Sequence, residues 1–293
     1  MSDGSVVPEA MMETYRRNGW VHLKGLLDPA EVAHYREAID QAVARRKRHD
    51  TRPLAEKSSY EQSFLQCQYL WEDFPAVRPL TFHPAVVGAA AALIGAERVR
   101  LWHDQALYKE AGGRETEAHQ DHPYWPLEPR DSTITAWIPL TPTDHRSGCM
   151  GYVSGSQNSE ARYINIFSEP GAGKALEAEQ PPATYAPAQP GDVLFHHGYT
   201  VHMAKANRSA ETRRAYTAIY FRDGCTRAPK GAHPSVDRDQ IAPGALIDGA
   251  AAPIAWPLPA GQFPEPAPWP DMGDSKLMQR AAKLGVFPAG VGE

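Results

Sequence analysis

The stretch QPGDVLFHHGYTVHMAKANRSAETRRAYTAIYF, residues 189–221, indicates the fold class of this chain. The turn Pro190-Gly191-Asp192 leads into the β-rich run DVLFHHG (192–198), and a short loop containing His202 follows. A polar segment then precedes a second β-rich run, RAYTAIYF (214–221). β-Branched and aromatic residues fit the pleated surface of a strand, whereas Gly, Pro, Asn and Asp interrupt it. The stretch therefore predicts two strands joined by a polar loop.

Three further runs of the same kind lie upstream, at 98–109, 133–140 and 149–155. Short strands separated by turn residues are typical of an antiparallel barrel or sandwich with helices packed on its outside. Residues 1–96 are mostly helical by pattern, with helices predicted at 8–17, 29–47 and 84–94 and a short strand within 19–27. Asp28 and Pro29 mark the start of the second helix, as N-cap and first helical residue. We expect a mainly β protein with flanking helices.

The segment after residue 225 has a different composition. Residues 253–270, PIAWPLPAGQFPEPAPWP, are too rich in proline to predict a sheet or a helix. A loosely ordered linker is one interpretation, but Trp256, Phe263 and Trp269 favour an extended arm anchored on the body. No boundary for a second domain is visible. We predict one domain over 1–293, with a barrel core at 97–224 and a proline-rich arm at 225–293.

Composition limits the partners that this chain is expected to have. The formal net charge is −5, and no zinc-finger or basic–aromatic signature is present, so no nucleic-acid partner is expected. No secretory signal and no stretch near ~18 apolar residues is visible, so no membrane partner is expected. Three widely separated cysteines, Cys67, Cys149 and Cys225, suit a reducing cytoplasm. We expect a cytoplasmic protein with a small-molecule partner; the oligomeric state is not predicted.

His119-Gln120-Asp121 is a candidate for one half of a metal site. A ferrous oxygenase site uses two imidazoles and one carboxylate and leaves three positions open. Residues i and i+2 of a strand point to the same side, so His119 and Asp121 could share an ion. The alternative is a surface turn in which Asp121 caps local backbone. His202 could complete the triad, although His197 is a second choice for the distal ligand.

Several motifs together resemble one family. They are, in order, HDQALYKEAGG, HQD, TAWIPLT, SGCMGYVSGSQ, PGDVLFHHG and HMAKANRSAETRR. In order and approximate spacing they are similar to the phytanoyl-CoA dioxygenase family of iron(II)/2-oxoglutarate-dependent oxygenases. The resemblance covers residues 98–221 and, more loosely, the first 50. It implies a double-stranded β-helix, the jelly-roll or cupin-like barrel. Gln157 departs from the family, which often has histidine after Gly155-Ser156.

The resemblance also implies roles for individual residues. It assigns the iron to His119, Asp121 and His202, since His202 keeps the family spacing to Asn207 and to Arg213. Arg213 would hold the far carboxylate of 2-oxoglutarate with its guanidinium fork. Arg214 would point to the other side of the strand, toward solvent or an outer helix.

Gln105 and Trp137 resemble positions that contact or line the cosubstrate pocket. For Trp137 the alternative is plain core packing. Tyr124 and Trp125 directly follow the metal triplet and form either a wall of the substrate pocket or a packed turn.

The resemblance implies an enzyme that uses iron (Fe(II)), 2-oxoglutarate and dioxygen (O2) as cofactors and cosubstrates. The expected reaction is hydroxylation of an unactivated C–H bond of a small-molecule metabolite, with release of succinate and CO2. Asp121 occupies the position that related halogenases leave free for chloride, and this favours hydroxylation; desaturation or ring closure stays open. The alternatives are a non-catalytic barrel with a structural metal, a 2-oxoglutarate-independent metal enzyme, and an interaction module that uses the proline-rich arm.

Overall fold

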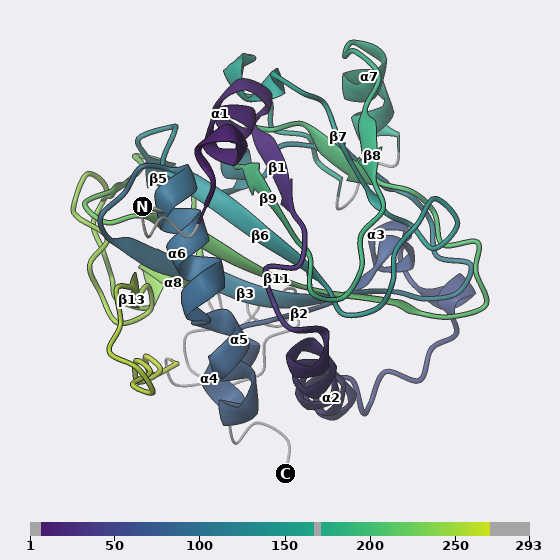
Figure 1. Ribbon diagram of the computed structural model, residues 1–293, viewed down its shortest axis with the longest axis horizontal. Coiled ribbons are helices and arrows are strands. Elements are labelled where there is room, and N and C mark those ends of the chain that lie inside the picture. Colours follow the sequence, from purple (N-terminus) through teal and green to yellow (C-terminus); the bar gives the residue numbers. More distant parts are fainter. Residues whose placement is uncertain (1–6, 167–170, 270–293) are drawn as a thin grey trace.

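The computed structural model describes residues 7–166 and 171–269 of the chain. Its centre is formed by antiparallel sheets, and helices from the first third of the chain cover one side (Figure 1). This arrangement confirms the prediction of a mainly β core with flanking helices.

The larger sheet, called here the major sheet, is antiparallel throughout. Strands 9, 6, 11 and 3 form its middle, strands 1 and 13 lie at its edges, and strand 2 also pairs with strand 3. The bounds are β1 (Trp20–Leu23), β9 (Val193–His197), β6 (Thr133–Pro139), β11 (Arg213–Arg222), β3 (Val99–Lys109), β13 (Ile254–Trp256) and β2 (Leu65–Gln68).

The second sheet, called here the minor sheet, has the order β4-β10-β7-β8. Its strands are β4 (Thr116–His119), β10 (His202–Ala204), β7 (Met150–Tyr152) and β8 (Thr184–Ala186), and a small ribbon pairs β5 (Leu127–Glu128) with β12 (Thr226–Arg227). The sequence analysis predicts β7 within a longer run, and it places His202 in a loop. That placement of His202 is wrong, because a strand of only three residues carries too little pattern to be recognised.

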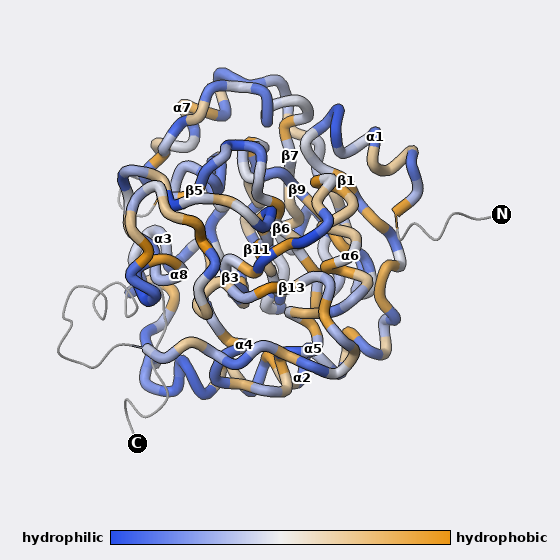
Figure 2. Tube along the Cα trace, turned by 90° about the vertical axis from the view of Figure 1, so that its left-hand side faces the viewer, coloured by the Kyte–Doolittle hydropathy of each residue, from blue (hydrophilic) through white to orange (hydrophobic). Residues whose placement is uncertain are grey.

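The helices of the N-terminal part pack on the outer face of the major sheet, except α3, which contacts β2 and lines a large cavity with Tyr60 and Glu61. Their bounds are α1 (Glu9–Asn18), α2 (Pro29–Arg46), α3 (Ser59–Ser63), α4 (Leu70–Asp73), α5 (Arg78–Thr81) and α6 (Pro84–Leu93), with short 3-10 turns η1 (Leu54–Glu56) and η2 (Pro75–Val77). Further along the chain lie η3 (His122–Tyr124), η4 (Ser156–Asn158), α7 (Ala172–Ala178) and α8 (Pro234–Asp237). Helix α6 is almost entirely apolar (Figure 2) and belongs to the main buried cluster together with outward residues of β3, β6 and β11.

The start of α2 follows the prediction. Asp28 lies in the extended region and its side chain accepts a hydrogen bond from the backbone N–H of Ala30 at 2.8 Å. Pro29 occupies the first turn, where no backbone donor is needed. Buried Val32, Tyr35 and Ile39 then face the core.

By length and composition alone, the helical stretch Pro75–Leu93 could cross a membrane, which differs from the expectation that no such stretch exists. In this fold 61% of its most apolar window is buried inside the protein. The stretch contains η2, α5 and α6, which pack against neighbouring helices and the outer face of the major sheet.

The proline-rich segment is described as far as Trp269; the rest of the predicted arm, 270–293, lies outside the described residues. Trp256 packs against α6 near Gly88, and Phe263 lies beside Phe82 with ring centroids 6.0 Å apart. The prediction that 253–270 contains no strand is wrong, because Ile254–Trp256 forms β13 on β3. An edge strand tolerates flanking prolines, since one side of it needs no ladder hydrogen bonds.

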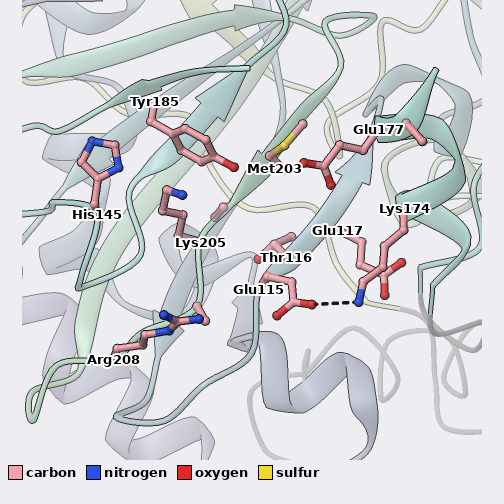
Figure 3. A pocket seen from close by; sticks show the side chains of 13 residues that line it. Glu115, Thr116, Glu117, His145, Lys174, Glu177, Tyr185, Met203, Lys205 and Arg208 are labelled. Carbon is pink, nitrogen blue, oxygen red and sulfur yellow. Dashed lines mark ion pairs between the residues drawn. The ribbon is translucent and has the colours of Figure 1, made fainter. Parts of the chain in front are cut away.

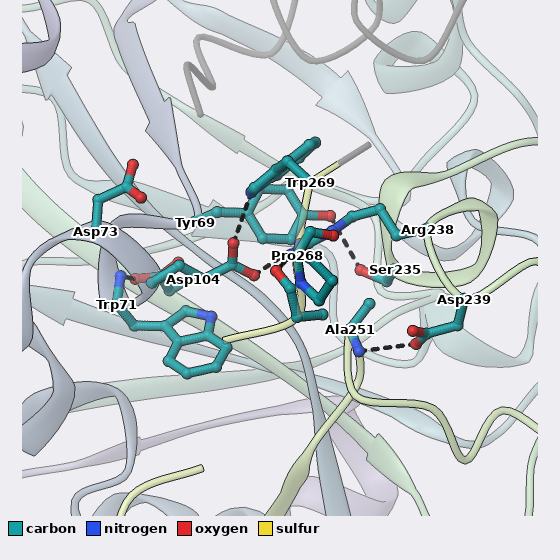
Figure 4. Close-up of polar contacts among 12 residues, drawn as sticks. Tyr69, Trp71, Asp73, Asp104, Ser235, Arg238, Asp239, Ala251, Pro268 and Trp269 are labelled. Atoms are coloured by element: carbon teal, nitrogen blue, oxygen red, sulfur yellow. Dashed lines mark hydrogen bonds and ion pairs between the residues drawn. The ribbon is translucent and has the colours of Figure 1, made fainter. Parts of the chain in front are cut away.

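A buried ion pair holds the last described residues (Figure 4). The Arg238 guanidinium lies 2.7 Å from a Glu72 carboxylate oxygen, and both side chains are almost fully buried. The Trp269 indole N–H donates to the other oxygen of Glu72 at 2.8 Å, and its ring lies 4.1 Å from the Arg238 guanidinium carbon. The segment is therefore tied to α4 by charge and by an aromatic contact.

Candidate metal centre

Two histidines face each other across the minor sheet. His119 ends β4, His202 begins β10, and the two residues are direct register partners. Asp121 follows two residues after His119. One ligand atom from each of these residues lies within 4.8 Å of the others, so the structure brings together the three side chains that the sequence analysis selected.

Asp121 reaches this position differently from the expectation. The sequence argument places His119 and Asp121 on one extended strand, but β4 ends at His119 and Asp121 has helical backbone angles (φ −74°, ψ −48°). Asp121 is the residue before the 3-10 turn η3, which rotates its carboxylate back toward the imidazoles. Gln120 points away, as predicted, because its side-chain amide donates to the carbonyl of Tyr199.

The hydrogen bonds of the two imidazoles leave the correct nitrogen free for a metal. Nδ1 of His119 lies 2.7 Å from the carbonyl of Glu117, and Nδ1 of His202 lies 2.9 Å from that of Thr200. A carbonyl only accepts, so each Nδ1 carries the proton and each Nε2 keeps its lone pair. The Nε2 atoms lie 3.7 and 3.5 Å from Oδ1 of Asp121.

These donors fit a first-row metal ion. Ligand atoms that lie about 2.1 Å from an ion, at right angles to one another, are about 3 Å apart. The distances from the two Nε2 atoms to Oδ1 of Asp121 would therefore have to shorten only slightly when a metal binds. Burial lowers the pKa of His119 and of His202 to about 4, so both imidazoles are neutral ligands at pH 7. Two imidazoles with one carboxylate match the ligand set of ferrous oxygenases.

Two further side chains orient the Asp121 carboxylate. The Thr135 hydroxyl donates to Oδ2 at 3.0 Å, and Nε2 of His196 lies 3.2 Å from the same oxygen. Oδ1 is therefore left to face the imidazoles. Burial opposes ionisation of Asp121, but His202, His196 and His119 outweigh it and lower the pKa of this carboxyl. The sequence analysis missed Thr135 and gave His196 no role.

Arg213 lies at the start of β11 and is 3% exposed. Among the described residues no hydrogen bond or ion pair engages its guanidinium, and the guanidinium carbon lies 5.4 Å from the centre of the Trp137 ring. A buried cation without a counter-ion is costly and needs an anionic partner. The far carboxylate of 2-oxoglutarate would supply that partner. Arg214 points to the outside and its Nε lies 3.1 Å from Asp40 of α2, as predicted.

Gln105 and Trp137 lie next to each other across β11. Thr217 pairs with both in register, and all three side chains line one cavity. The indole N–H of Trp137 and the hydroxyl of Thr217 have no partner among the described residues. The Gln105 side-chain oxygen accepts from Gln66 and Gln68, so its amide N–H groups are free to face the cavity. Sequence reasoning did not find Gln66, Gln68 or Thr217.

The cavity that contains these residues has a volume of about 850 Å³. That is within the ~300–1,000 Å³ range of small-molecule sites. The three candidate ligands and Arg213 all line it, as do Tyr124 and Trp125. The Tyr124 hydroxyl donates to the carbonyl of Ile164 at 2.6 Å, so this ring is both a cavity wall and part of a packed turn.

The competing histidines have other positions. His197 points to the other face of β9, and its Nδ1 accepts from the backbone N–H of Tyr199. His122 is held between the Thr133 hydroxyl and the carbonyl of Leu127. Neither belongs to the ligand cluster, so the structure favours His202 as the distal partner.

A second hollow of about 650 Å³ lies between the minor sheet and α7 (Figure 3). Two of its cationic side chains contact neighbours: Lys174 lies 3.4 Å from Glu115, and the Lys205 ammonium lies 3.9 Å from the Tyr185 ring centre. This hollow contains no ligand set like that of the larger cavity, as far as the described residues go.

Comparison with known proteins identifies the family. Residues 15–215 match the phytanoyl-CoA dioxygenase (PhyH) family. This chain belongs to the phytanoyl-CoA dioxygenase family. A probable phytanoyl-CoA dioxygenase of Caenorhabditis elegans is 24% identical over 77% of this chain and 78% of its own length. The 1-deoxypentalenic acid 11-beta-hydroxylase of Streptomyces exfoliatus is 26% identical over 69% and 76%.

Solved structures agree with the family. The non-heme alpha-ketoglutarate-dependent carbocyclase SnoK from nogalamycin biosynthesis has a TM-score of 0.71 to this chain. It is 28% identical, and the match covers 87% of this chain and 99% of SnoK. The predictions of a double-stranded β-helix and of a dioxygenase-family enzyme are confirmed.

The departure of this family member at Gln157 concerns packing. The Gln157 side-chain amide donates to the carbonyls of Arg16 and Arg17 at the end of α1. It does not line the large cavity. The substitution therefore ties the loop after β7 to the N-terminal helix.

Proposed function

We propose that this protein is an iron(II)- and 2-oxoglutarate-dependent dioxygenase that hydroxylates an unactivated C–H bond of a small-molecule metabolite. One observation carries the proposal: three metal-ligating atoms converge in the same cavity as a buried guanidinium that has no described counter-ion. A structural metal site would give no reason for the unpaired charge of Arg213.

Each residue then has a defined task. His119, Asp121 and His202 hold iron(II), and Thr135 with His196 keeps Asp121 turned toward the imidazoles. Arg213 binds the far carboxylate of 2-oxoglutarate through two parallel hydrogen bonds. Trp137 and Thr217 have unused donors beside it, and Gln105 presents its amide to the same space.

When bound, iron with 2-oxoglutarate and dioxygen supplies an oxidant strong enough to break an unactivated C–H bond, and succinate and carbon dioxide are released. The chain positions that C–H bond, keeps the cosubstrate in one orientation and limits the access of water. Closure of a carbocycle is the second candidate, because SnoK is named a carbocyclase. The product distinguishes them: hydroxylation adds one oxygen atom, whereas ring closure removes two hydrogen atoms.

The experiment is anaerobic titration of the iron(II)-loaded protein with 2-oxoglutarate. We expect a weak visible charge-transfer band in wild type, and succinate formation after oxygen is admitted. His202→Ala should lose iron binding and the band. His197→Ala is the matched control, because His197 lies on the opposite face of β9, and it should keep both. Normal behaviour of the His202 variant would contradict the ligand assignment.

We also propose that the protein is located in the reducing cytoplasm. Cys67, Cys149 and Cys225 are buried free thiols, which is compatible with a compartment in which disulfides do not form. The location is tested by fractionation of the source cells with an antibody against the protein.

A further inference from the structure

The large cavity is longer than the cosubstrate needs. Arg213 pairs in register with Lys109 at one end of β3, and Gln105 and His103 follow on the same face of that strand. Six residues of extended chain separate Lys109 from His103, which is about 20 Å. 2-Oxoglutarate has five carbons and extends from Arg213 only part of the way. The remaining part, which we call the outer chamber, contains Gln68, His103 and Trp125.

The outer chamber offers no cation to an anionic substrate. Among the described residues that line the whole cavity, Arg213 alone is a lysine or arginine, and the cosubstrate uses it. Burial lowers the pKa of His103 to about 4, so this imidazole is neutral at pH 7. The lining Glu61 is already paired with Arg52 at 2.7 Å. A phosphate or carboxylate placed here would lose its hydration without a charged partner.

A chain of hydrogen bonds determines how the side-chain amide of Gln68 is oriented in the outer chamber. The Tyr60 hydroxyl donates to the Gln66 oxygen, and the Gln66 amide donates to the Gln105 oxygen. The Gln68 amide donates to that same Gln105 oxygen at 3.4 Å. Gln68 must therefore turn its own oxygen away from Gln105. That oxygen is buried and has no partner among the described residues.

Such an atom calls for a hydrogen-bond donor. A buried acceptor that stays unpaired destabilises the protein, and native proteins satisfy nearly all such acceptors. Gln68 is 4% exposed, and His103 of the same chamber is 3% exposed, with an Nδ1 that has no partner among the described residues. A hydroxyl group can both donate to Gln68 and accept from a neighbour.

Aromatic side chains form the other walls. Tyr124 and Trp125, which follow the metal triplet, line the cavity together with Tyr163, and Phe64 lines it from the α3 side. The rings of Tyr124 and Tyr163 lie 5.2 Å apart, edge to face. Rings arranged in this way favour a flat ligand with a π-system or a rigid cyclic skeleton.

We propose that the substrate is an uncharged, flat cyclic molecule whose hydroxyl group donates to Gln68. This inference rests on the proposed function, since it assigns Arg213 to 2-oxoglutarate. It disfavours acyl-CoA, phosphonate and free carboxylate substrates for this chain. It also makes Gln68 a specificity-determining residue, whereas Gln66 acts through Gln105 as a positioning residue.

The test uses three probes of one shape: 2-naphthol with a neutral hydroxyl, naphthalene with none, and 2-naphthoate with a charge. Binding to the anaerobic iron(II)–2-oxoglutarate protein is measured by equilibrium dialysis. We expect 2-naphthol to bind at least about tenfold more tightly than 2-naphthoate, and more tightly than naphthalene. Equal or tighter binding of 2-naphthoate overturns the inference, and so does failure of 2-naphthol to bind at millimolar concentration.

A variant locates the contact. Gln68→Leu should weaken 2-naphthol binding about tenfold and leave naphthalene binding unchanged. Gln189→Leu, at an exposed turn before β9, is the matched control and should change neither. Unchanged 2-naphthol binding in the Gln68 variant overturns the assignment. The charge-transfer band, recorded in the same samples without probe, reports separately on the proposed function and on the folding of the variants.

Discussion

Replacing Arg213 by methionine should have opposite effects on the metal-free protein and on its loaded form. In the metal-free protein the guanidinium is buried without a described counter-ion. Its register partner Lys109 is also fully buried, and burial together with the Arg213 charge lowers the pKa of Lys109 well below its usual value. Arg213→Met therefore removes an unfavourable charge. The same change removes the proposed anchor for the diacid cosubstrate.

The size of each effect follows from the burial of Arg213. Burial lowers its pKa from the ordinary value of about 12.5 to about 10, and each pKa unit corresponds to 1.36 kcal/mol. The buried charge thus costs roughly 3 kcal/mol. Loss of the contact with Trp137 destabilises the protein by about 1 kcal/mol. The net effect of Arg213→Met should therefore be to stabilise the metal-free protein by about 2 kcal/mol. Two charge-assisted hydrogen bonds to a carboxylate contribute about 4 kcal/mol, or about 1,000-fold in affinity.

Two measurements check the prediction. Urea unfolding of the metal-free proteins gives the stability difference, and anaerobic titration of the iron-loaded proteins gives the 2-oxoglutarate affinity. Arg214→Met is the control, because Arg214 pairs with Asp40 on the outside; it should cost at most about 1 kcal/mol and leave 2-oxoglutarate affinity unchanged. A destabilised metal-free Arg213 variant, or one whose 2-oxoglutarate affinity falls less than about tenfold, would refute the reasoning.

Three further predictions concern a hydrogen bond at the candidate metal centre, a buried ion pair and a buried carboxyl group. Thr135→Val removes a hydrogen bond to Asp121 and should weaken iron binding about 10-fold, measured by competition with a chelator; full affinity would contradict the orienting role. Arg238→Met leaves the Glu72 carboxylate buried without its counter-ion and should cost about 3–5 kcal/mol in urea unfolding, whereas a loss below 1 kcal/mol would show that the pair is dispensable. Burial raises the pKa of Asp104 to about 7, whereas the pKa of an aspartate in an unfolded chain is about 3.9. The native state therefore binds this proton more tightly, and the free energy of unfolding should fall as pH rises from about 4 to 7. Asp104→Asn should remove up to about 4 kcal/mol of that fall, and an unchanged pH profile would rule this proton out.

The long strands and helices were predictable because each carries a complete pattern. The runs at 98–109, 133–140 and 214–221 correspond to β3, β6 and β11 within one or two residues. The strands of the minor sheet were harder, because β4 and β10 have only four and three residues. Their pairing depends on contacts between distant segments, which local propensity does not contain. Strand β13 was missed because prolines flank it.

The candidate metal ligands were predictable from the order of the motifs, but the conformation that joins them was not. Asp121 lies in a helical turn after the strand, and no spacing rule indicates that turn. Supporting groups such as Thr135, His196 and Gln68 reach the site across the sheets. Their roles depend on register between β6, β9, β3 and β2, which only the three-dimensional arrangement provides.

The division of the site between two sheets has a mechanical consequence. Both imidazoles stand on the minor sheet, whereas the guanidinium stands on the major one. The distance across the gap between the two sheets therefore determines how a diacid cosubstrate that contacts both of them is positioned. Trp20 of β1 stacks on Tyr152 of β7 at 4.8 Å and acts as a spacer in that gap. A smaller side chain at residue 20 would leave every ligand in place and still shift the alignment of the diacid relative to the ion.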